Sequence, residues 1–243
     1  SPIKKSKAKF INGFFDKNFI YKDKFNTVVH SHVFEHVYNH DEFMANISLF
    51  MKDGDNLIFS LPNMFNMLKK KYTNCLNFEH TVFLTEPYVE YLLSKYGFEI
   101  IEKKYFRDDH SIFYSTVRTS NMKIKEISKD LYSINKKIYN EYRIYHEKLI
   151  TNLNKLISES KKSIYLFGGH IFSQYLICTG LHTTNIDCLL DNDPNKQGKR
   201  LYGTSMFVKS PNCLKSVNEP LIILKAGAYN EEIKKDILKN INA

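Results

Sequence analysis

Two short stretches of the chain carry side chains that could do chemistry. The first is the run VVHSHVFEHV from Val28 to Val37, in which three histidines and a glutamate follow an apolar start. An apolar run that ends in polar residues is typical of a buried parallel strand, and open α/β sheets bind ligands at the carboxyl ends of such strands. We therefore predict a ligand-binding edge here, and we interpret Glu35 and His36 as structural residues within it.

The same stretch raises the question of a metal site. His30, His32 and His36 carry the imidazole nitrogen that Zn²⁺ often takes as a ligand. However, the two side chains of a His-x-His pair point to opposite faces of an extended strand, and the pattern offers no identifiable third ligand. We therefore predict no metal site.

The second stretch is Asn77-Phe78-Glu79-His80, which is followed by Thr85 at the start of a predicted helix. A neutral imidazole with a pKa near ~6.5 suits proton abstraction at physiological pH. His80 is therefore a candidate general base, with Glu79 as the residue that orients it or the substrate. The alternative, that Glu79 and His80 only cap the helix that Thr85 opens, stays open.

The elements that must position these residues alternate between strand-like and helix-like patterns over residues 1–119. Short β-branched or apolar runs predict strands, and apolar residues at helical spacing behind an acidic first turn predict helices. The predicted strands cover 26–30, 56–61, 98–106 and 112–117, and the predicted helices begin at Asp41 and Thr85.

Two further zones follow. Residues 120–160 contain no Gly or Pro, and their apolar positions advance by three or four, which predicts a long amphipathic helix. Residues 161–243 alternate strands at 163–167, 186–190 and 221–224 with helices at 171–179 and 230–241. Such alternation favours an α/β fold with a parallel sheet.

These patterns resemble a known family. The stretch from Val28 to Asn63 resembles the fourth and fifth strands of class I S-adenosylmethionine methyltransferases, whose fourth strand commonly ends in a phrase like HVLEHV. The segment around Glu79 and His80 resembles the Y-x-E-H-x-x-x-x-S/T stretch of sugar C-methyltransferases. The phrases LFGG from Leu166 and LDNDPNKQGK from Leu190 resemble the carboxy-terminal domain of the same enzymes.

The resemblance implies an α/β architecture in three parts. Residues 1–119 would be the carboxy-terminal part of a class I, Rossmann-like methyltransferase domain, and 120–160 a helical connector. Residues 161–243 would be a second, small Rossmann-like domain. Because no glycine-rich loop precedes residue 28, and Ser1-Pro2 commonly follows the ribose-binding acid in relatives, we expect a piece cut after that loop. Relatives also carry a zinc-binding amino-terminal domain.

The resemblance also implies a cofactor and its contacts. The cofactor would be S-adenosyl-L-methionine. Gly13, Phe14 and Phe15 would flank its adenine, and His30 and His32 would lie at its methionine end. The third glycine of a GxGxxG fingerprint is missing after Gly168, so we do not expect NAD binding.

The implied substrate is a nucleotide-linked keto-deoxysugar used for polysaccharide or glycoconjugate synthesis. His80 would remove a proton next to the ketone, and the resulting enolate would take the methyl group. The candidate substrate contacts are Asn77, His110, Gly168, Gly169 and His170. Two departures weaken the match: Asn77 replaces a tyrosine, and Asp108-Asp109-His110-Ser111 replaces H-G-G-S. A nucleotide-sugar or protein binding module without methyl transfer, and sugar O- or N-methylation, stay open as alternatives.

The amino-acid composition limits which classes of partner the protein can bind. The chain has 243 residues, 43% of them hydrophobic, which is enough for a sizeable core. Its net charge of +9 is spread among interleaved acids, so we expect a solvated surface rather than nucleic-acid binding. No apolar run approaches the ~18–20 residues that span a bilayer, and no CxxC pair occurs, so we expect a cytoplasmic protein without a membrane partner. Assembly into a homo-oligomer stays open.

Overall fold

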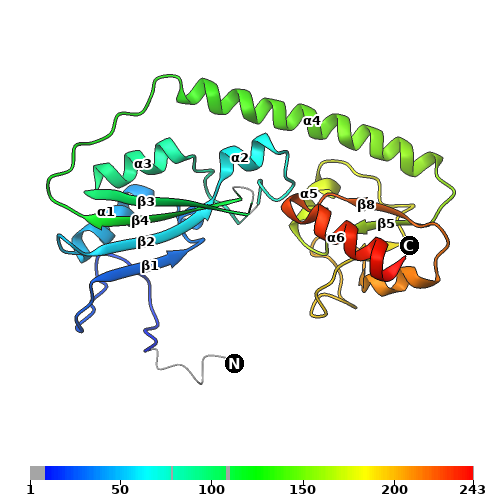
Figure 1. Ribbon diagram of the computed structural model, residues 1–243, viewed down its shortest axis with the longest axis horizontal. Coiled ribbons are helices and arrows are strands. Elements are labelled where there is room, and N and C mark those ends of the chain that lie inside the picture. The colour runs from blue at the N-terminus through cyan, green and yellow to red at the C-terminus, as the bar shows by residue number, and fades with distance from the viewer. Residues whose placement is uncertain (1–8, 78, 108–109, 243) are drawn as a thin grey trace.

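The structure is a computed structural model that describes residues 9–77, 79–107 and 110–242. Phe78 and the predictions that rest on Ser1-Pro2 and Asp108-Asp109 lie outside the described residues. Two four-stranded sheets lie at opposite ends of the molecule, and one long helix runs along both of them (Figure 1). The α/β architecture that the sequence predicts is confirmed.

The first sheet joins a parallel pair of strands to an antiparallel hairpin. Its strand order is β1-β2-β4-β3, with β1 and β2 parallel and the other neighbours antiparallel. These are the four strands predicted over residues 1–119. Their bounds are β1 Thr27–Ser31, β2 Asn56–Pro62, β3 Phe98–Phe106 and β4 Ser111–Arg118.

Three helices accompany this sheet: α1 His40–Phe50, α2 Met64–Lys69 and α3 Glu86–Lys95. The core beneath them contains an aromatic stack. Phe59 of β2 is 2% exposed and lies between the parallel rings of His30 and Tyr114, each with a centroid 5.0 Å away. Thr85 is the N-cap of α3 as predicted, but its side chain makes no capping hydrogen bond and instead accepts one from Asn135.

The second sheet is fully parallel, with the order β7-β6-β5-β8. Its strands are apolar and mostly buried, as expected for parallel strands covered by helices on both faces. The bounds of the regular elements are β5 Ile164–Phe167, α5 Ile171–Cys178, β6 Cys188–Leu190, β7 Val208–Lys209, β8 Leu221–Leu224 and α6 Asn230–Asp236. Short 3₁₀ helices cover Pro211–Ser216 and Gly227–Tyr229, and α6 continues as a π-helix over Ile237–Ile241.

The long helix α4 covers Leu131–Glu159, so the prediction of helix from residue 120 is wrong for the first eleven residues. That segment makes tertiary contacts instead. The Lys125 amide donates to Ser94 Oγ, the Lys125 ammonium pairs with Glu90, and Ser120 Oγ donates to Asp53. Because these contacts hold the backbone against the end of α3, apolar spacing alone does not make it helical.

A shared core joins the two halves of the molecule. Tyr142 of α4 is 1% exposed, and its hydroxyl donates to the carbonyl of Tyr72 at 3.0 Å. Thr73 Oγ1 donates across to the carbonyl of Lys225 at 2.8 Å. The buried members of this bridging core are Met64, Met67, Leu68, Tyr72, Cys75, Ile138 and Tyr142. In the described part of the chain, no helix has the length and apolar character that crossing a membrane requires.

A buried histidine in α4 makes stability depend on pH. His146 is 2% exposed, and burial lowers its pKa from the ordinary value of 6.5 to about 4. The folded protein therefore excludes a proton that the unfolded chain binds below pH ~6.5, so stability is lost as the pH falls from about 6.5 to 4. We expect His146→Gln to reduce the loss of unfolding free energy between pH 7 and pH 5 by about 2 kcal/mol.

Urea titrations at the two pH values measure this loss. The matched control is His182→Gln, at an exposed position, which should leave the loss unchanged. Equal pH dependence in the parent protein and His146→Gln would contradict the assignment.

Candidate functional site

The predicted ligand-binding edge is formed where β1 and β2 end. The two strands are parallel, and Ser31 Oγ lies 2.7 Å from Ser60 Oγ near their carboxyl ends. The chain then turns sharply at His32, whose φ of 51° lies in the left-handed region that non-glycine residues adopt infrequently. One turn of 3₁₀ helix, Phe34–His36, follows directly. The turn brings Glu35 back beneath His32.

Glu35 is the buried acid at the centre of this edge. It is 3% exposed, and its Oε1 accepts a hydrogen bond from His32 Nδ1 at 2.9 Å. Burial alone would raise its pKa, but the bond from His32 and the nearby His80 outweigh burial and lower the pKa below its ordinary value. Glu35 is therefore a carboxylate at neutral pH.

The second motif docks onto the first. The amide of Thr81 donates to the carbonyl of Glu35 at 2.9 Å, and His36 Nδ1 donates to the carbonyl of Glu79 at 2.9 Å. These bonds place the rings of His36 and His80 with their centroids 5.0 Å apart. The two motifs are far apart in the sequence, whereas the fold makes them one site.

His80, the candidate base, is half-buried within this site. Burial lowers its pKa, and the charge of Glu35 opposes that shift. Its Nδ1 is buried with no hydrogen-bond partner among the described residues. Glu79 is exposed, and it is the backbone carbonyl of Glu79 that holds His36. The acid whose charge acts most on His80 is Glu35, a residue that the sequence analysis interprets as structural.

His110 also reaches this edge. Asn74 Nδ2 donates to its Nε2 at 3.3 Å, and its Nδ1 lies 3.0 Å from Ser111 Oγ. Burial lowers its pKa, and the nearby His32 lowers it further. We call His32, Glu35, His36, His80 and His110 the carboxyl-edge cluster.

The predicted adenine contacts lie in the segment before β1. Phe14 is exposed (88%), whereas Phe15 packs its ring 5.2 Å from that of Phe50. Of the two predicted methionine-end contacts, His30 is stacked on Phe59, and burial lowers its pKa to about 4. His32 keeps an exposed ring at the edge. No described hollow is lined by Gly13, Phe14 and Phe15 together, so their role stays a prediction.

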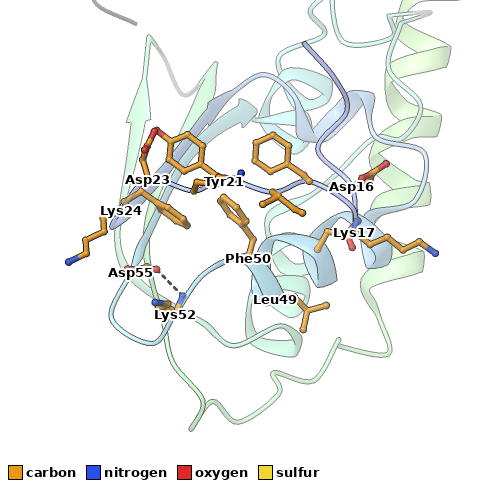
Figure 2. A pocket seen from close by; sticks show the side chains of 14 residues that line it. Asp16, Lys17, Tyr21, Asp23, Lys24, Leu49, Phe50, Lys52 and Asp55 are labelled. Atoms are coloured by element: carbon orange, nitrogen blue, oxygen red, sulfur yellow. Dashed lines mark hydrogen bonds between the residues drawn. The ribbon is translucent and has the colours of Figure 1, made fainter. Parts of the chain in front are cut away.

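Figure 2 shows a hollow of about 610 Å³ between the segment from Asp16 to Phe25 and the end of α1. The turn before β2 closes it, where the Lys52 amide donates to Asp55 Oδ2 at 2.8 Å. This position is at the amino ends of β1 and β2, opposite the edge where parallel sheets bind ligands. It contains none of the predicted site residues, and we do not assign it a ligand.

A second hollow, of about 560 Å³, lies between the two halves of the chain and contains predicted residues from both. Asn77 and Glu79 line it from one side and Gly169 and His170 from the other. The chain also brings three cations here that the sequence analysis does not single out, namely Lys196, Lys199 and Arg200.

Two glycines shape the wall of this hollow. Gly168 has a φ of 115°, which an L side chain rarely adopts, and it makes the turn after β5. A Cβ on Gly169 would lie 2.9 Å from a Val208 methyl group, so only glycine fits without a shift. The Gly169 amide donates to Asp191 at 2.8 Å, and Asp191 also pairs with Lys196. We call this hollow the interdomain hollow. Gly168, a predicted substrate contact, does not line it.

Four of the five residues of the carboxyl-edge cluster, all but His110, lie in a part of the chain that matches a known family. Residues 3–103 match the family model of a methyltransferase domain. The match contains β1, β2, His32, Glu35 and His80, and it ends within β3. It supports an enzyme and implies S-adenosyl-L-methionine as cofactor, which confirms these two expectations. The sugar C-methyltransferase subfamily is not part of that match.

One solved structure similar to this chain comes from Listeria monocytogenes and is described as an S-adenosylmethionine-dependent methyltransferase. It is 14% identical, and the alignment covers 49% of this chain and 74% of that chain with a TM-score of 0.40. No curated protein sequence matches the chain significantly.

Proposed function

We propose that this protein transfers a methyl group from S-adenosyl-L-methionine to a carbon of a nucleotide-linked keto-deoxysugar. The observation that carries the proposal is the interdomain hollow, which borders the methyltransferase region on one side and a cationic surface on the other. A nucleotide sugar has matching parts, because a neutral sugar is joined to a dianionic diphosphate. The wall for the sugar comes from one half of the chain and the cationic wall for the diphosphate comes from the other half.

The diphosphate would lie against Lys196, Lys199 and Arg200. All three line the hollow, and an arginine can bind phosphate oxygens in a bidentate manner. The hollow also includes His170 and Ile171, where α5 begins, and the start of a helix favours negative charge. Both effects favour the same end of the substrate.

The sugar would lie against the opposite wall. Asn77 and Glu79 line that wall, and their amide and carboxylate groups can hydrogen-bond to sugar hydroxyls. His80 follows directly in the chain and belongs to the carboxyl-edge cluster. This order supports a role for His80 as the base between a sugar in the hollow and a cofactor at the edge.

The proposed reaction balances as follows. His80 takes the proton from the carbon next to the ketone, and the electron pair of that C–H bond forms the enolate. The enolate carbon then forms a bond to the methyl carbon as the sulfur–methyl bond breaks. S-adenosyl-L-methionine supplies an electrophilic methyl group and leaves as S-adenosylhomocysteine. The exposed rings of Phe14 and His32 are our candidates for contacts to its adenine and methionine ends.

The cations of the interdomain hollow provide a direct test. We expect the double variant Lys199→Ala, Arg200→Ala to bind thymidine diphosphate at least about tenfold more weakly, because each lost phosphate contact removes roughly 1–3 kcal/mol of charge-assisted hydrogen bonding. Isothermal titration with the diphosphate alone measures the effect without requiring turnover.

A matched control separates local from general charge effects. Lys215→Ala, Lys239→Ala removes two lysines that do not line the hollow, so diphosphate affinity should stay unchanged. Equal losses in both double variants would contradict the placement of the diphosphate. Tight diphosphate binding together with no methyl transfer to any nucleotide sugar would favour a binding module instead.

A further inference from the structure

We propose that Glu35, His36 and His80 form a binding site for a first-row transition-metal ion, with Zn²⁺ as the best fit. Each residue offers one ligand atom, and the three atoms all lie within 4.8 Å of one another. Two come from the turn after β1 and one from the segment that docks onto it. None of the three ligands lines the interdomain hollow.

His36 has the tautomer of a metal ligand. Its Nδ1 donates to the carbonyl of Glu79, so the proton is on Nδ1 and the lone pair is on Nε2. Metal-binding histidines usually donate their second ring N–H to a carbonyl or carboxylate, which fixes the ring and makes the other nitrogen more basic. The ring of His36 is also exposed, so solvent ions can reach it.

The other two ligands have buried atoms that a cation would satisfy. Glu35 Oε1 is bonded to His32, whereas Oε2 is buried with no hydrogen-bond partner among the described residues. The Nδ1 of His80 is likewise buried and without such a partner. Because buried polar atoms are nearly always paired, two such atoms in one cluster of ligand type point to a shared cation.

The donor set selects the kind of metal. Two imidazole nitrogens and one carboxylate oxygen suit Zn²⁺ and its transition-metal neighbours, whereas Mg²⁺ and Ca²⁺ prefer oxygen ligands. Three protein ligands leave a fourth position of a tetrahedral ion for water or a substrate oxygen. Bond lengths of about 2.0–2.2 Å place the ligand atoms of a tetrahedral ion nearer to one another than the 4.8 Å within which all three lie here.

The metal would also regulate the proposed reaction, and this one consequence rests on the proposed function. A nitrogen that binds a metal cannot accept a proton, so the metal-bound protein would lack its base. Zn²⁺ would therefore inhibit methyl transfer, and His36→Ala would relieve the inhibition without removing His80.

Metal binding by the purified chain, freed of any affinity tag, tests the site without an activity assay. We expect Co²⁺ to give visible d–d absorption bands that saturate at one equivalent, and Zn²⁺ to abolish them. Zn²⁺ affinity, measured by competition with a chromophoric chelator, should fall at least about tenfold in His36→Ala. It should also fall about 10–100-fold in His32→Ala, which removes the partner of Glu35.

The matched control is His182→Ala, an exposed histidine far along the chain, which should keep full affinity. Because His36 is exposed, its variant should fold, and circular dichroism checks this. An absence of Co²⁺ bands in the parent protein, or unchanged Zn²⁺ affinity in folded His36→Ala, would overturn the proposal. Diphosphate binding at the interdomain hollow would be unaffected by either result, so failure here and failure of the proposed function are distinguishable.

Discussion

Replacing His80 with alanine should lower methyl transfer to a nucleotide-linked keto-deoxysugar by roughly 10²–10⁴-fold, the usual contribution of a positioned general base. His80 is half-buried, directly follows Glu79 of the interdomain hollow in the chain, and lies near enough to Glu35 for that charge to act on its pKa. Without it, no neutral imidazole remains at that position to take the proton. The rate of S-adenosylhomocysteine formation measures the effect, under metal-free conditions.

Two further variants make this result specific. His182→Ala, which removes an exposed histidine elsewhere, should keep the parent rate. His36→Ala keeps the base but removes the bond to the Glu79 carbonyl that helps to hold it, so its loss of activity should be smaller than that of His80→Ala. Binding of thymidine diphosphate should be unchanged in His80→Ala, and added imidazole should restore part of the rate. Turnover within a few-fold of the parent protein would rule out His80 as the base.

Tyr142→Ala should destabilise the protein by about 3–5 kcal/mol, the range measured for large buried aromatic residues. Tyr142 is 1% exposed and belongs to the bridging core between the two sheets. The substitution removes its ring contact with Tyr175, 5.8 Å between centroids, and its hydrogen bond to Tyr72. Guanidinium unfolding followed by circular dichroism measures the change.

The same helix offers a matched control. Tyr132 of α4 is 73% exposed, so Tyr132→Ala should change stability by no more than about 0.5 kcal/mol. Tyr142→Phe keeps the ring and loses the hydroxyl bond, and it should cost about 1 kcal/mol. Similar losses in Tyr132→Ala and Tyr142→Ala would mean that α4 does not carry the contact between the halves.

Much of the fold follows from local pattern. The β-branched run before His30 and the apolar run from Asn56 to Leu61 became β1 and β2, because period and composition determine which faces of a strand can be buried. The same reasoning found the hairpin β3–β4 and the alternation of strands and helices after residue 161. The strand β7 was missed, because a strand of two residues is too short to show an alternation of apolar and polar positions. The predicted helix also extended too far before α4, into a segment that hydrogen bonds to Asp53 and Ser94 hold in another conformation.

The sequence by itself determined which functional groups are available: the histidines at the end of a strand, a Glu-His pair, and a turn at which only glycine fits. The tertiary structure decided which of these groups meet. Only the docking of Thr81 and Glu79 onto the turn at Glu35 places His80 beside that acid and beside His36. Only the packing of the two halves gives Asn77 and Lys199 a common hollow. These contacts join loops, whose residues show no hydrophobic periodicity, so the local sequence does not predict them. Burial of a shared core brings the loops together.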